Sequence, residues 1–377
     1  MQYRKIPDNK DRLSILGFGL MRLPVDKDNK IDEAKTIKML QFAIESGVNY
    51  FDTAFPYHDG ASEPLLGRLL QTIDRKKVFV ATKLPTWLIK TRADMDTYLD
   101  QQLERLQTDY IDYYLMHGLN GKRWIDMKKL GAIDFLEAAK AAGKIRHIGF
   151  SFHDKYPAFR KIIDSYNWEF CQIQHNYFDL YREAGIRGLK YAASKGMGII
   201  IMEPIMGGKL AGEIPSEAQK VWSKSKHNWT PAERALRFVW NYPQVQLVLS
   251  GMSSIKQMQE NISIAAKVKP DSISDEELKL YKQVRRVYLS KMVVRCTGCG
   301  YCMPCPSKVA IPWVLGMYND AHMFGDKKRH QRDYTFFIPD ANKADKCTRC
   351  GACLPKCPQK IDIPAELKKA IDFFAGK

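Results

Sequence analysis

Short apolar runs alternate with amphipathic segments along the first two thirds of the chain. Eight of these runs have the length and composition of buried strands. They span residues 15–20, 50–54, 78–84, 111–117, 145–151, 171–176, 198–202 and 245–250. Between them, apolar residues recur at helical spacing, as at Ala34, Ile37 and Leu40. A hairpin of residues 3–6 and 12–15, turning at Pro7-Asp8-Asn9, is expected to precede the first run.

The boundaries between these segments carry helix signals. Thr230-Pro231-Ala232-Glu233 has the residues that open a helix, and Gly143 ends the helix predicted over residues 135–142. Strands and helices that alternate eight times predict an α/β fold, and at 377 residues a closed (β/α)8 TIM barrel fits best. A doubly wound open sheet is the alternative. It is weakened because Gly17-Phe18-Gly19 is not followed by the third glycine of a Gly-x-Gly-x-x-Gly turn.

Polar residues stand at the predicted carboxyl ends of three neighbouring strands, where a barrel holds its reactive groups. Asp52 ends the second strand, Tyr57 follows in a loop, Lys83 ends the third strand and His117 the fourth. An ammonium from Lys83, held by Asp52, would lower the pKa of the Tyr57 phenol, and His117 could hydrogen-bond a carbonyl oxygen. The alternative treats each residue singly, as a structural ion pair, a half-buried aromatic and a core histidine. Ser62 is expected to cap the next helix.

Eight of the nine cysteines lie between Cys296 and Cys357. Residues 347–358 read C-x2-C-x2-C-x3-C-P, and residues 296–306 differ from that pattern by one residue in the last gap. Three thiolates at this spacing can hold one 4Fe-4S cluster, while the fourth is directed elsewhere. Zinc, which favours two CxxC pairs, and free cysteines are the alternatives. Cys171 lies outside both motifs and is expected to be a small buried apolar residue.

Composition and charge indicate where the protein is expected to reside and which partners it is expected to bind. The sequence has no apolar run long enough for a membrane span and no signal-peptide pattern, so a cytoplasmic protein without membrane association is expected. The net charge is +17, and residues 291–377 carry 15 Lys/Arg against 8 Asp/Glu. No nucleic-acid-binding motif accompanies this charge, so nucleic acid is not an expected partner. An acidic protein or a phosphorylated cofactor is compatible with it.

In their contexts FDTAFPY, VATKL and YLMHG, the residues Asp52, Tyr57, Lys83 and His117 resemble the catalytic tetrad of the aldo-keto reductases. The similarity covers about residues 1–290. It implies that the barrel binds an extended nicotinamide dinucleotide, NADP(H) or NAD(H), and moves hydride between its C4 and a substrate carbonyl. Tyr57 would be the general acid in carbonyl reduction, and its phenolate the base in alcohol oxidation.

The same resemblance implies a set of contacts to the dinucleotide. Ser151 and Gln172 correspond to groups that hold the carboxamide. Glycines after the seventh and eighth strands let the backbone approach a pyrophosphate, and the helix opened by Ser253-Ser254 offers free amides to an anion. The full set is Gly19, Met21, Arg22, Ser151, Gln172, Met202, Pro204, Gly207, Gly208, Ser250, Gly251, Met252, Ser253, Gln257 and Asn261.

Three positions depart from the family pattern. Met202 stands where a stacking aromatic is usual, and Phe152 where an asparagine usually follows the strand-five serine. The basic pair that commonly grips a 2′-phosphate is missing, with only Lys256 nearby. These departures leave the choice between NAD and NADP open.

The cysteine-rich segment resembles the bacterial dicluster ferredoxins. This resemblance implies two 4Fe-4S clusters whose ligands cross over between the motifs, with helices in the spacer as in the α-helical ferredoxin type. The implied ligand sets are Cys296, Cys299, Cys302 and Cys357 for one cluster, and Cys347, Cys350, Cys353 and Cys305 for the other. The predicted domains are a barrel over residues 1–290 and a ferredoxin-type domain over residues 291–377.

Three functions follow from these features. The leading hypothesis is an NAD(P)H-dependent aldo-keto reductase-type oxidoreductase acting on a small-molecule carbonyl or alcohol. The second is an iron-sulfur electron-transfer oxidoreductase that docks an acidic electron-carrier protein. Because hydride carries two electrons and a cluster takes one, such coupling calls for a carrier such as a flavin, which no motif indicates. The third is a non-catalytic redox sensor that binds nucleotide. Trp87, Trp124 and Trp222, in or near loops at the barrel mouth, favour an apolar or aromatic pocket.

Overall fold

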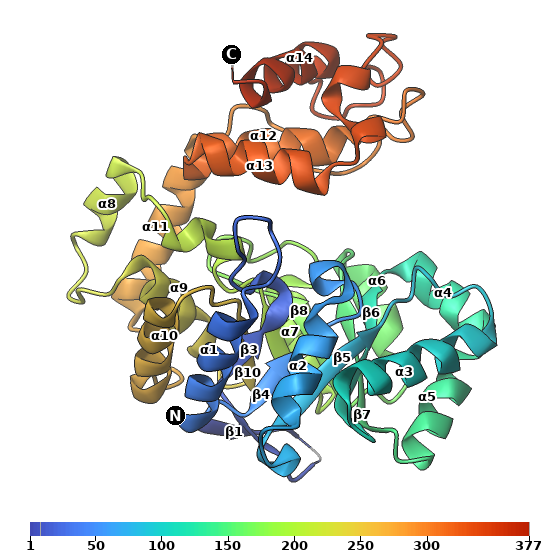
Figure 1. Cartoon of the computed structure of the whole chain (residues 1–377). Coiled ribbons are helices and arrows are strands. Elements are labelled where there is room, and N and C mark those ends of the chain that lie inside the picture. Colours follow the sequence, from blue (N-terminus) through green and yellow to red (C-terminus); the bar gives the residue numbers. More distant parts are fainter. Residues whose placement is uncertain (8, 377) are drawn as a thin grey trace. The chain divides into compact units, whose positions relative to one another are not determined.

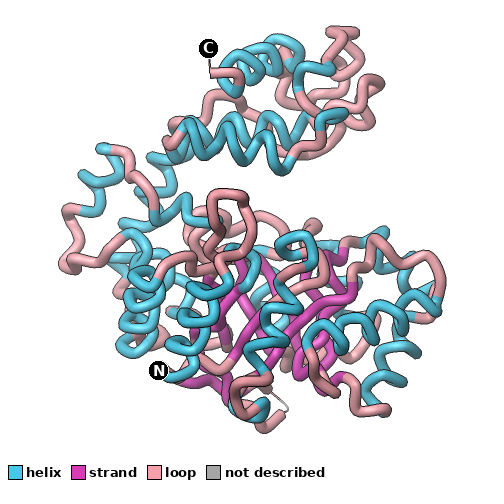
Figure 2. The backbone as a smooth tube through the Cα atoms, viewed as in Figure 1, coloured by secondary structure: helices cyan, strands magenta, loops and turns pink. Residues whose placement is uncertain are grey.

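The computed structural model describes residues 1–7 and 9–376. Eight parallel strands form a closed barrel in the order β10-β3-β4-β5-β6-β7-β8-β9 (Figure 1, Figure 2). They are β3 (Leu16–Gly19), β4 (Tyr50–Asp52), β5 (Phe79–Leu84), β6 (Ile111–Leu119), β7 (Ile145–Phe152), β8 (Phe170–Gln174), β9 (Gly198–Met202) and β10 (Leu247–Ser250). All eight predicted strands are confirmed, and closure of the barrel excludes the open sheet.

Helices follow the strands and cover the outside of the barrel (Figure 1). They are α1 (Glu33–Glu45), α2 (Ser62–Leu70), α3 (Arg92–Leu106), α4 (Gly121–Lys129), α5 (Ala132–Ala141), α6 (Tyr156–Ile163), α7 (Gly185–Ser194), α9 (Pro231–Trp240) and α10 (Ile255–Lys267). Side chains that bond to the first-turn amides begin several of them, including Asp32 for α1 and Thr91 for α3. As predicted, α9 begins at Pro231, and α5 ends just before Gly143, whose φ is +74°.

The N-terminal hairpin packs with the residues that fill the barrel. Its strands β1 (Tyr3–Lys5) and β2 (Arg12–Ser14) pair antiparallel, which confirms the predicted hairpin. Ile6 and Leu13 are buried in the same cluster as inward-facing residues such as Tyr50 and Tyr113. The hairpin therefore covers the amino ends of the strands and leaves the carboxyl ends for chemistry. Asp8 of the predicted turn lies outside the described residues.

An ionic cluster fastens the hairpin to the barrel. His147 of β7 lies 3.1 Å from a carboxylate oxygen of Asp11 and 2.7 Å from one of Glu169. Burial alone lowers the pKa of His147, but the two carboxylates outweigh burial and raise it to about 9. His147 is therefore charged at neutral pH and holds both carboxylates.

The chain divides into two compact units. The first contains Met1–Gly207 and Ala232–Ser274, and the second contains Gly208–Pro231 and Asp275–Lys377. The helices of the second unit are α8 (Ser216–Trp222), α11 (Asp275–Ser290), α12 (Ile311–Phe324), α13 (Lys327–Phe337) and α14 (Ile363–Phe374). The helices predicted between the cysteine motifs are confirmed by α12 and α13. The domain boundary at residue 290 stays a prediction.

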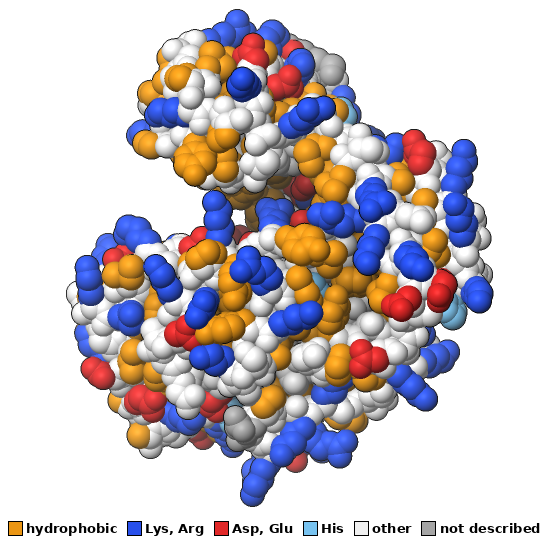
Figure 3. Space-filling view, turned by 180° about the vertical axis from the view of Figure 1, so that it is seen from behind, with side chains coloured by type: hydrophobic (Ala, Val, Ile, Leu, Met, Phe, Trp, Pro, Cys, Tyr) orange, Lys and Arg blue, Asp and Glu red, His pale blue; other side chains and the backbone are white. Residues whose placement is uncertain are grey.

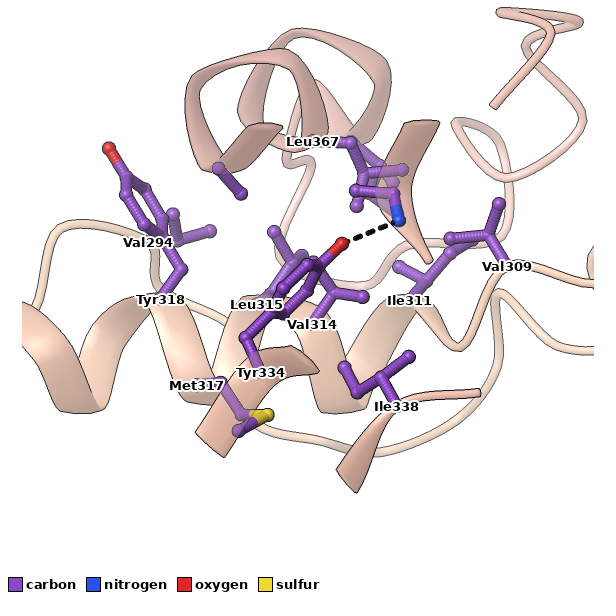
Figure 4. Close-up of a cluster of buried hydrophobic side chains, with 13 residues drawn as sticks. Val294, Val309, Ile311, Val314, Leu315, Met317, Tyr318, Tyr334, Ile338 and Leu367 are labelled. Carbon is purple, nitrogen blue, oxygen red and sulfur yellow. Dashed lines mark hydrogen bonds between the residues drawn. The ribbon is translucent and has the colours of Figure 1, made fainter. Parts of the chain in front are cut away.

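The second unit has its own apolar core, shown in Figure 4. Val314 and Leu315 of α12 are buried in it with Leu367 of α14, and six of the eight cysteines of the two motifs pack against it. The Tyr334 hydroxyl accepts a hydrogen bond of 2.9 Å from the backbone N–H of Ala344, just before the second motif (Figure 4). This hydrogen bond fastens the segment that leads into Cys347 to the core of the second unit.

The face of the molecule drawn in Figure 3 is not uniformly basic. On the face drawn in Figure 3, Lys and Arg side chains are spread over both units among apolar and acidic ones. No helix among the described residues is long and apolar enough to cross a membrane.

Candidate active site and cluster cavities

The structure brings together the four polar residues predicted at the strand ends. The Nζ of Lys83 lies 2.7 Å from Oδ1 of Asp52 and 2.6 Å from the carbonyl oxygen of Thr53. The same ammonium lies 5.0 Å from the ring centroid of Tyr57, and the rings of Tyr57 and His117 are 6.1 Å apart. Lys83 and Asp52 are almost fully buried.

A strained turn presents Tyr57. Its backbone N–H bonds to the carbonyl oxygen of Ala54, and the next two residues, His58 and Asp59, have left-handed backbone angles. The His58 ring accepts a hydrogen bond from the N–H of Leu23, which fastens the turn to the loop after β3. The prediction that Ser62 caps α2 is wrong. Its hydroxyl bonds to that of Thr53 at 2.8 Å, so it ties α2 to the end of β4.

Burial and neighbouring charges together set the protonation of Tyr57, Lys83 and His117. Burial raises the pKa of Tyr57 and the neighbouring Lys83 ammonium lowers it; the net shift is upward. Lys83 therefore lowers the pKa of Tyr57 as expected, but desolvation of the phenolate outweighs this one cation, so the pKa does not fall below its usual value. Burial lowers the pKa of Lys83, but Asp52 and Tyr57 raise it above its usual value. Burial and the Lys83 charge keep the pKa of His117 well below its usual value. At neutral pH the site holds a phenol, an ammonium and a neutral imidazole.

A buried polar network holds the strand that carries Lys83. The carboxylate of Glu63, in the first turn of α2, accepts hydrogen bonds from Thr82 (2.6 Å) and from the side-chain amide of Gln102 (2.8 Å). That amide also donates to the carbonyl oxygen of Lys83 at 3.0 Å. Arg105 reaches the second Glu63 oxygen at 3.3 Å. Sequence reasoning missed Glu63; its signal was a charged residue on the side of α2 where apolar residues recur.

Residues assigned to the carboxamide lie at the ends of neighbouring strands. The hydroxyl of Ser151 accepts a 2.8 Å hydrogen bond from the N–H of Gly118 and remains able to donate. Gln172 lies 3.9 Å from the sulfur of Met202, and its Oε1 is buried with no partner among the described residues. An orphaned amide oxygen needs a donor. A carboxamide N–H of nicotinamide is a suitable one, so these residues fit that group.

The remaining predicted contacts are distributed unevenly. Arg22 bonds to the carbonyl oxygen of Gly207 at 3.1 Å and to the Glu203 carboxylate at 3.4 Å. Asn261 donates to the hydroxyl of Ser250, and Gln257 accepts from Ser253. Gly19 is the last residue of β3 and Gly251 follows β10. Met21 is exposed, and Met252 and Pro204 are buried. Gly208 begins the second unit.

The three tryptophans differ in their placement. Trp87 is exposed, and its ring meets that of His117 edge-on at 4.9 Å. Trp124 is buried against Trp168, and Trp222 is buried against Tyr281 in the second unit. Trp87 therefore stands beside the tetrad. The expectation that Trp124 overlies the mouth is wrong, because it serves as a core residue.

Two cavities lie among the cysteines of the second unit. The first has an empty volume of about 330 Å³ and the second of about 320 Å³, and both are partly open to solvent. The first is lined by Cys296, Cys299, Cys302 and Cys357, and the second by Cys305, Cys347, Cys350 and Cys353. Cysteine thiolates are the ligands that 4Fe-4S clusters require. The residues present therefore fit two clusters with the crossed grouping; the ligand assignment itself stays a prediction.

The cysteine side chains line two cavities and do not converge on a single metal-ion position. Within residues 1–7 and 9–376, no three His, Cys, Asp or Glu side chains gather closely enough to hold one metal ion. A structural zinc site needs four ligands within about 2.3 Å of one centre. The arrangement is therefore unlike a zinc site. Cys171 is buried in the barrel, as expected, and burial raises its pKa.

Comparison with known proteins agrees with this architecture. A family model described as "Aldo/keto reductase family" matches residues 15–283, and one described as "4Fe-4S dicluster domain" matches residues 295–361. The oxidoreductase YqkF of Bacillus subtilis, described as uncharacterized, is 26% identical over 305 residues, which cover 74% of this chain and 95% of YqkF. L-galactose dehydrogenase of Arabidopsis thaliana is 27% identical over 312 residues, covering 74% of this chain and 92% of that enzyme.

Solved structures resemble the chain as well. The apo form of aldo-keto reductase AKR11C1 from Bacillus halodurans aligns with a TM-score of 0.61 at 25% identity, covering 75% of this chain and 96% of that one. The holo form gives a TM-score of 0.64 at 24% identity over the same shares.

Proposed function

The chain belongs to the aldo-keto reductase family, and we propose that it reduces a small-molecule carbonyl to an alcohol, or runs the reverse reaction, with Tyr57 as the acid and base. It is an oxidoreductase with a 4Fe-4S domain. The proposal concerns the cofactor, NADP(H) or NAD(H), and the roles of the four clustered residues.

The side chains divide the work of a carbonyl reduction. Tyr57 gives its hydroxyl proton to the carbonyl oxygen, and its raised pKa keeps that proton available at neutral pH. The Lys83 ammonium, held by Asp52, stabilises the phenolate until water returns a proton. The neutral His117 imidazole donates a hydrogen bond to the same oxygen and orients it. When bound, a reduced nicotinamide dinucleotide supplies the hydride for the carbonyl carbon.

The observation that carries the proposal is the buried Lys83–Asp52 pair directly beneath the Tyr57 ring. A purely structural role for the Lys83–Asp52 pair would not explain why a phenol and an imidazole lie beside it at the same strand ends. Perturbed titratable groups that converge in this way mark reactive sites more often than cores.

The test is the Tyr57→Phe variant of the full-length protein with its clusters loaded. Carbonyl-dependent oxidation of NADPH or NADH should fall by roughly a hundredfold or more, which is the usual contribution of a positioned acid. Tyr110→Phe is the matched control, because Tyr110 precedes β6 at the opposite end of the barrel from His117. A wild-type rate in Tyr57→Phe would refute the assignment.

The residues that would hold the dinucleotide are proposed on local grounds. The unpartnered Oε1 of Gln172 and the hydroxyl of Ser151 suit a carboxamide. Arg22 packs against Gly207 and Gly251, so its guanidinium stands beside the loops that follow β9 and β10. Met21, Met202, Pro204, Gly208 and the loop from Ser250 to Ser253 complete the proposed set with Gly19, Gln257 and Asn261.

A second function, electron transfer through the clusters, is favoured by the charge around the cysteines. Five exposed basic side chains in the two cluster segments have no acidic partner among the described residues: Arg295, Lys308, Arg349, Lys356 and Lys360. In these segments, residues 295–308 and 343–360, Asp345 is the single acidic residue, and it pairs with Lys346 at 2.8 Å. When bound, the clusters exchange single electrons. We propose an acidic electron-carrier protein as the partner for this rim.

This second function has its own test. Anaerobic mixing with a reduced acidic flavodoxin should reduce the clusters at a rate that falls steeply with salt, and Arg349→Glu should slow it. Lys282→Glu, an equal charge change on α11, is the control. Equal rates in all three proteins would refute docking at this rim.

A further inference from the structure

Arg123 lies beside the proposed active site and contacts its exposed aromatic wall. It stands in the first turn of α4, half-buried, with its guanidinium carbon 5.8 Å from the ring centroid of Trp87. The Trp87 ring in turn meets His117 at 4.9 Å, and His117 meets Tyr57 at 6.1 Å. These contacts form a continuous strip that runs from the phenol to the guanidinium.

The backbone is shaped to hold this guanidinium. The pairing of β6 with β7 is irregular between Met116 and Leu119, and Gly118 in that stretch has a φ of +60°. Irregularities of this kind re-aim side chains next to active sites. The turned carbonyl oxygen of Gly118 accepts a 2.6 Å hydrogen bond from Nη1 of Arg123. The same distortion that presents His117 therefore fixes Arg123.

Two other cations near the site have carboxylate partners, and Arg123 has none. Lys83 is paired with Asp52, and Arg22 with Glu203. Across the part of the chain that the structure describes, no carboxylate lies within 4 Å of Arg123, and the acceptor of its guanidinium is the Gly118 carbonyl oxygen. The nearest acid along this loop pair, Asp154, is engaged by the N–H of Gly121.

An unpaired, half-buried guanidinium favours an anion. Burial lowers the pKa of Arg123, and no carboxylate offsets this cost. The planar fork of a guanidinium matches a carboxylate in two parallel hydrogen bonds. A phosphate dianion would call for a second cation, and Lys83 and Arg22 already have carboxylate partners. Trp87 offers an apolar face between the guanidinium and His117.

We propose that the substrate is a carbonyl compound that bears a carboxylate, with an aromatic or alkyl spacer lying against Trp87 and the carboxylate bound by Arg123. This inference rests on the proposed carbonyl reduction, since it names the substrate class of that same site. Arg123 sets specificity: it holds the end of the substrate remote from the carbonyl that Tyr57 and His117 contact.

The kinetic test compares two matched aldehydes, 4-carboxybenzaldehyde and benzaldehyde, with the full-length protein. Arg123→Gln should lower kcat/KM for the carboxylated aldehyde by about tenfold or more, mainly through KM, and change benzaldehyde by no more than about twofold. Lys122→Gln removes the same charge from the adjacent exposed position and should change neither. An equal loss on both aldehydes would show a structural role for Arg123 and overturn the proposal, as would no loss on either.

A binding measurement separates this inference from the proposed function. Isothermal titration calorimetry without nucleotide should find benzoate bound at least about tenfold more tightly than neutral benzamide, and Arg123→Gln should abolish that preference. If wild-type protein shows no preference, the carboxylate site is refuted even where benzaldehyde is reduced. If the preference is present and neither aldehyde is reduced, the carboxylate site stands and the proposed reaction fails.

Discussion

Replacement of Asp52 by Asn should both destabilise and inactivate the barrel, because it removes the counter-ion of a buried ammonium. The Lys83 Nζ lies 2.7 Å from the Asp52 oxygen, and the two side chains are only 1% and 4% exposed. Leaving one buried charge unpaired costs about 3–5 kcal/mol. Since one Asp52 oxygen has no partner among the described residues and an asparagine oxygen can still accept from Lys83, we expect a loss near the lower figure.

A double variant separates stability from chemistry. Replacing both partners by apolar residues, Asp52→Leu with Lys83→Met, should return the free energy of unfolding to within about 1 kcal/mol of wild type. Activity should stay lost. Urea unfolding of the cluster-loaded protein, followed by tryptophan fluorescence and far-UV circular dichroism together, measures both variants. A loss below about 1 kcal/mol in Asp52→Asn, or a double variant no more stable than Asp52→Asn, would refute the reasoning.

The same pair predicts a pH dependence. The pKa of Lys83 is raised in the folded protein above its ordinary value of 10.5. Its contribution to stability is therefore complete below 10.5 and is lost only as the pH rises through the folded-state pKa. The stability difference between wild type and Asp52→Asn should stay constant from neutral pH to about 10. A difference that disappears near neutral pH would contradict a charged Lys83.

Three further predictions test other parts of the structure. The pKa of His147 is raised to about 9 in the folded protein, so its charge stabilises the hairpin fully below its unfolded pKa of about 6.5. This stabilisation, at most about 3 kcal/mol, is lost as the pH rises through 9. In His147→Gln the urea midpoint should therefore change less with pH across this window than in wild type. Cys357→Ser should perturb the same cluster signal in electron paramagnetic resonance as Cys296→Ser, and perturbation of different signals would contradict the crossed arrangement. Gly67→Ala should lower the thermal midpoint, since the new Cβ would lie 2.4 Å from a carbonyl oxygen of α3. Gly316→Ala is the control: it lies in α12, its new Cβ would have no neighbouring heavy atom within 4 Å, and it should raise the midpoint or leave it unchanged.

The strands and the four clustered residues were predictable because both follow from local pattern. Eight apolar runs specify parallel strands, and closure of a parallel barrel brings every carboxyl end to one mouth. Asp52, Lys83 and His117 needed only their positions at those ends. The cysteine motifs could be predicted equally well, since the spacing of their cysteines is what binding of a 4Fe-4S cluster requires.

Other features depend on distances that the sequence does not contain. The net pKa of Tyr57 reflects a balance between burial and one cation, and its sign could not be read from residue types. Ser62 has the composition of a cap yet bonds across to Thr53. Trp124 looked like a mouth residue and is buried against Trp168. The lack of a carboxylate near Arg123 depends on what other strands and loops bring, or fail to bring, to that position.

The central claim is that Tyr57, Lys83 and His117 together perform two-electron carbonyl chemistry in the barrel. Anaerobic stopped-flow spectroscopy of the full-length protein tests it most directly, by following the nicotinamide band and the cluster bands separately while a carbonyl substrate is reduced. The account predicts that one nicotinamide is oxidised for each carbonyl reduced, that the cluster bands stay constant, and that Tyr57→Phe removes the reaction. Cluster bands that change in step with carbonyl reduction, or a Tyr57→Phe variant that reacts at the wild-type rate, would contradict it.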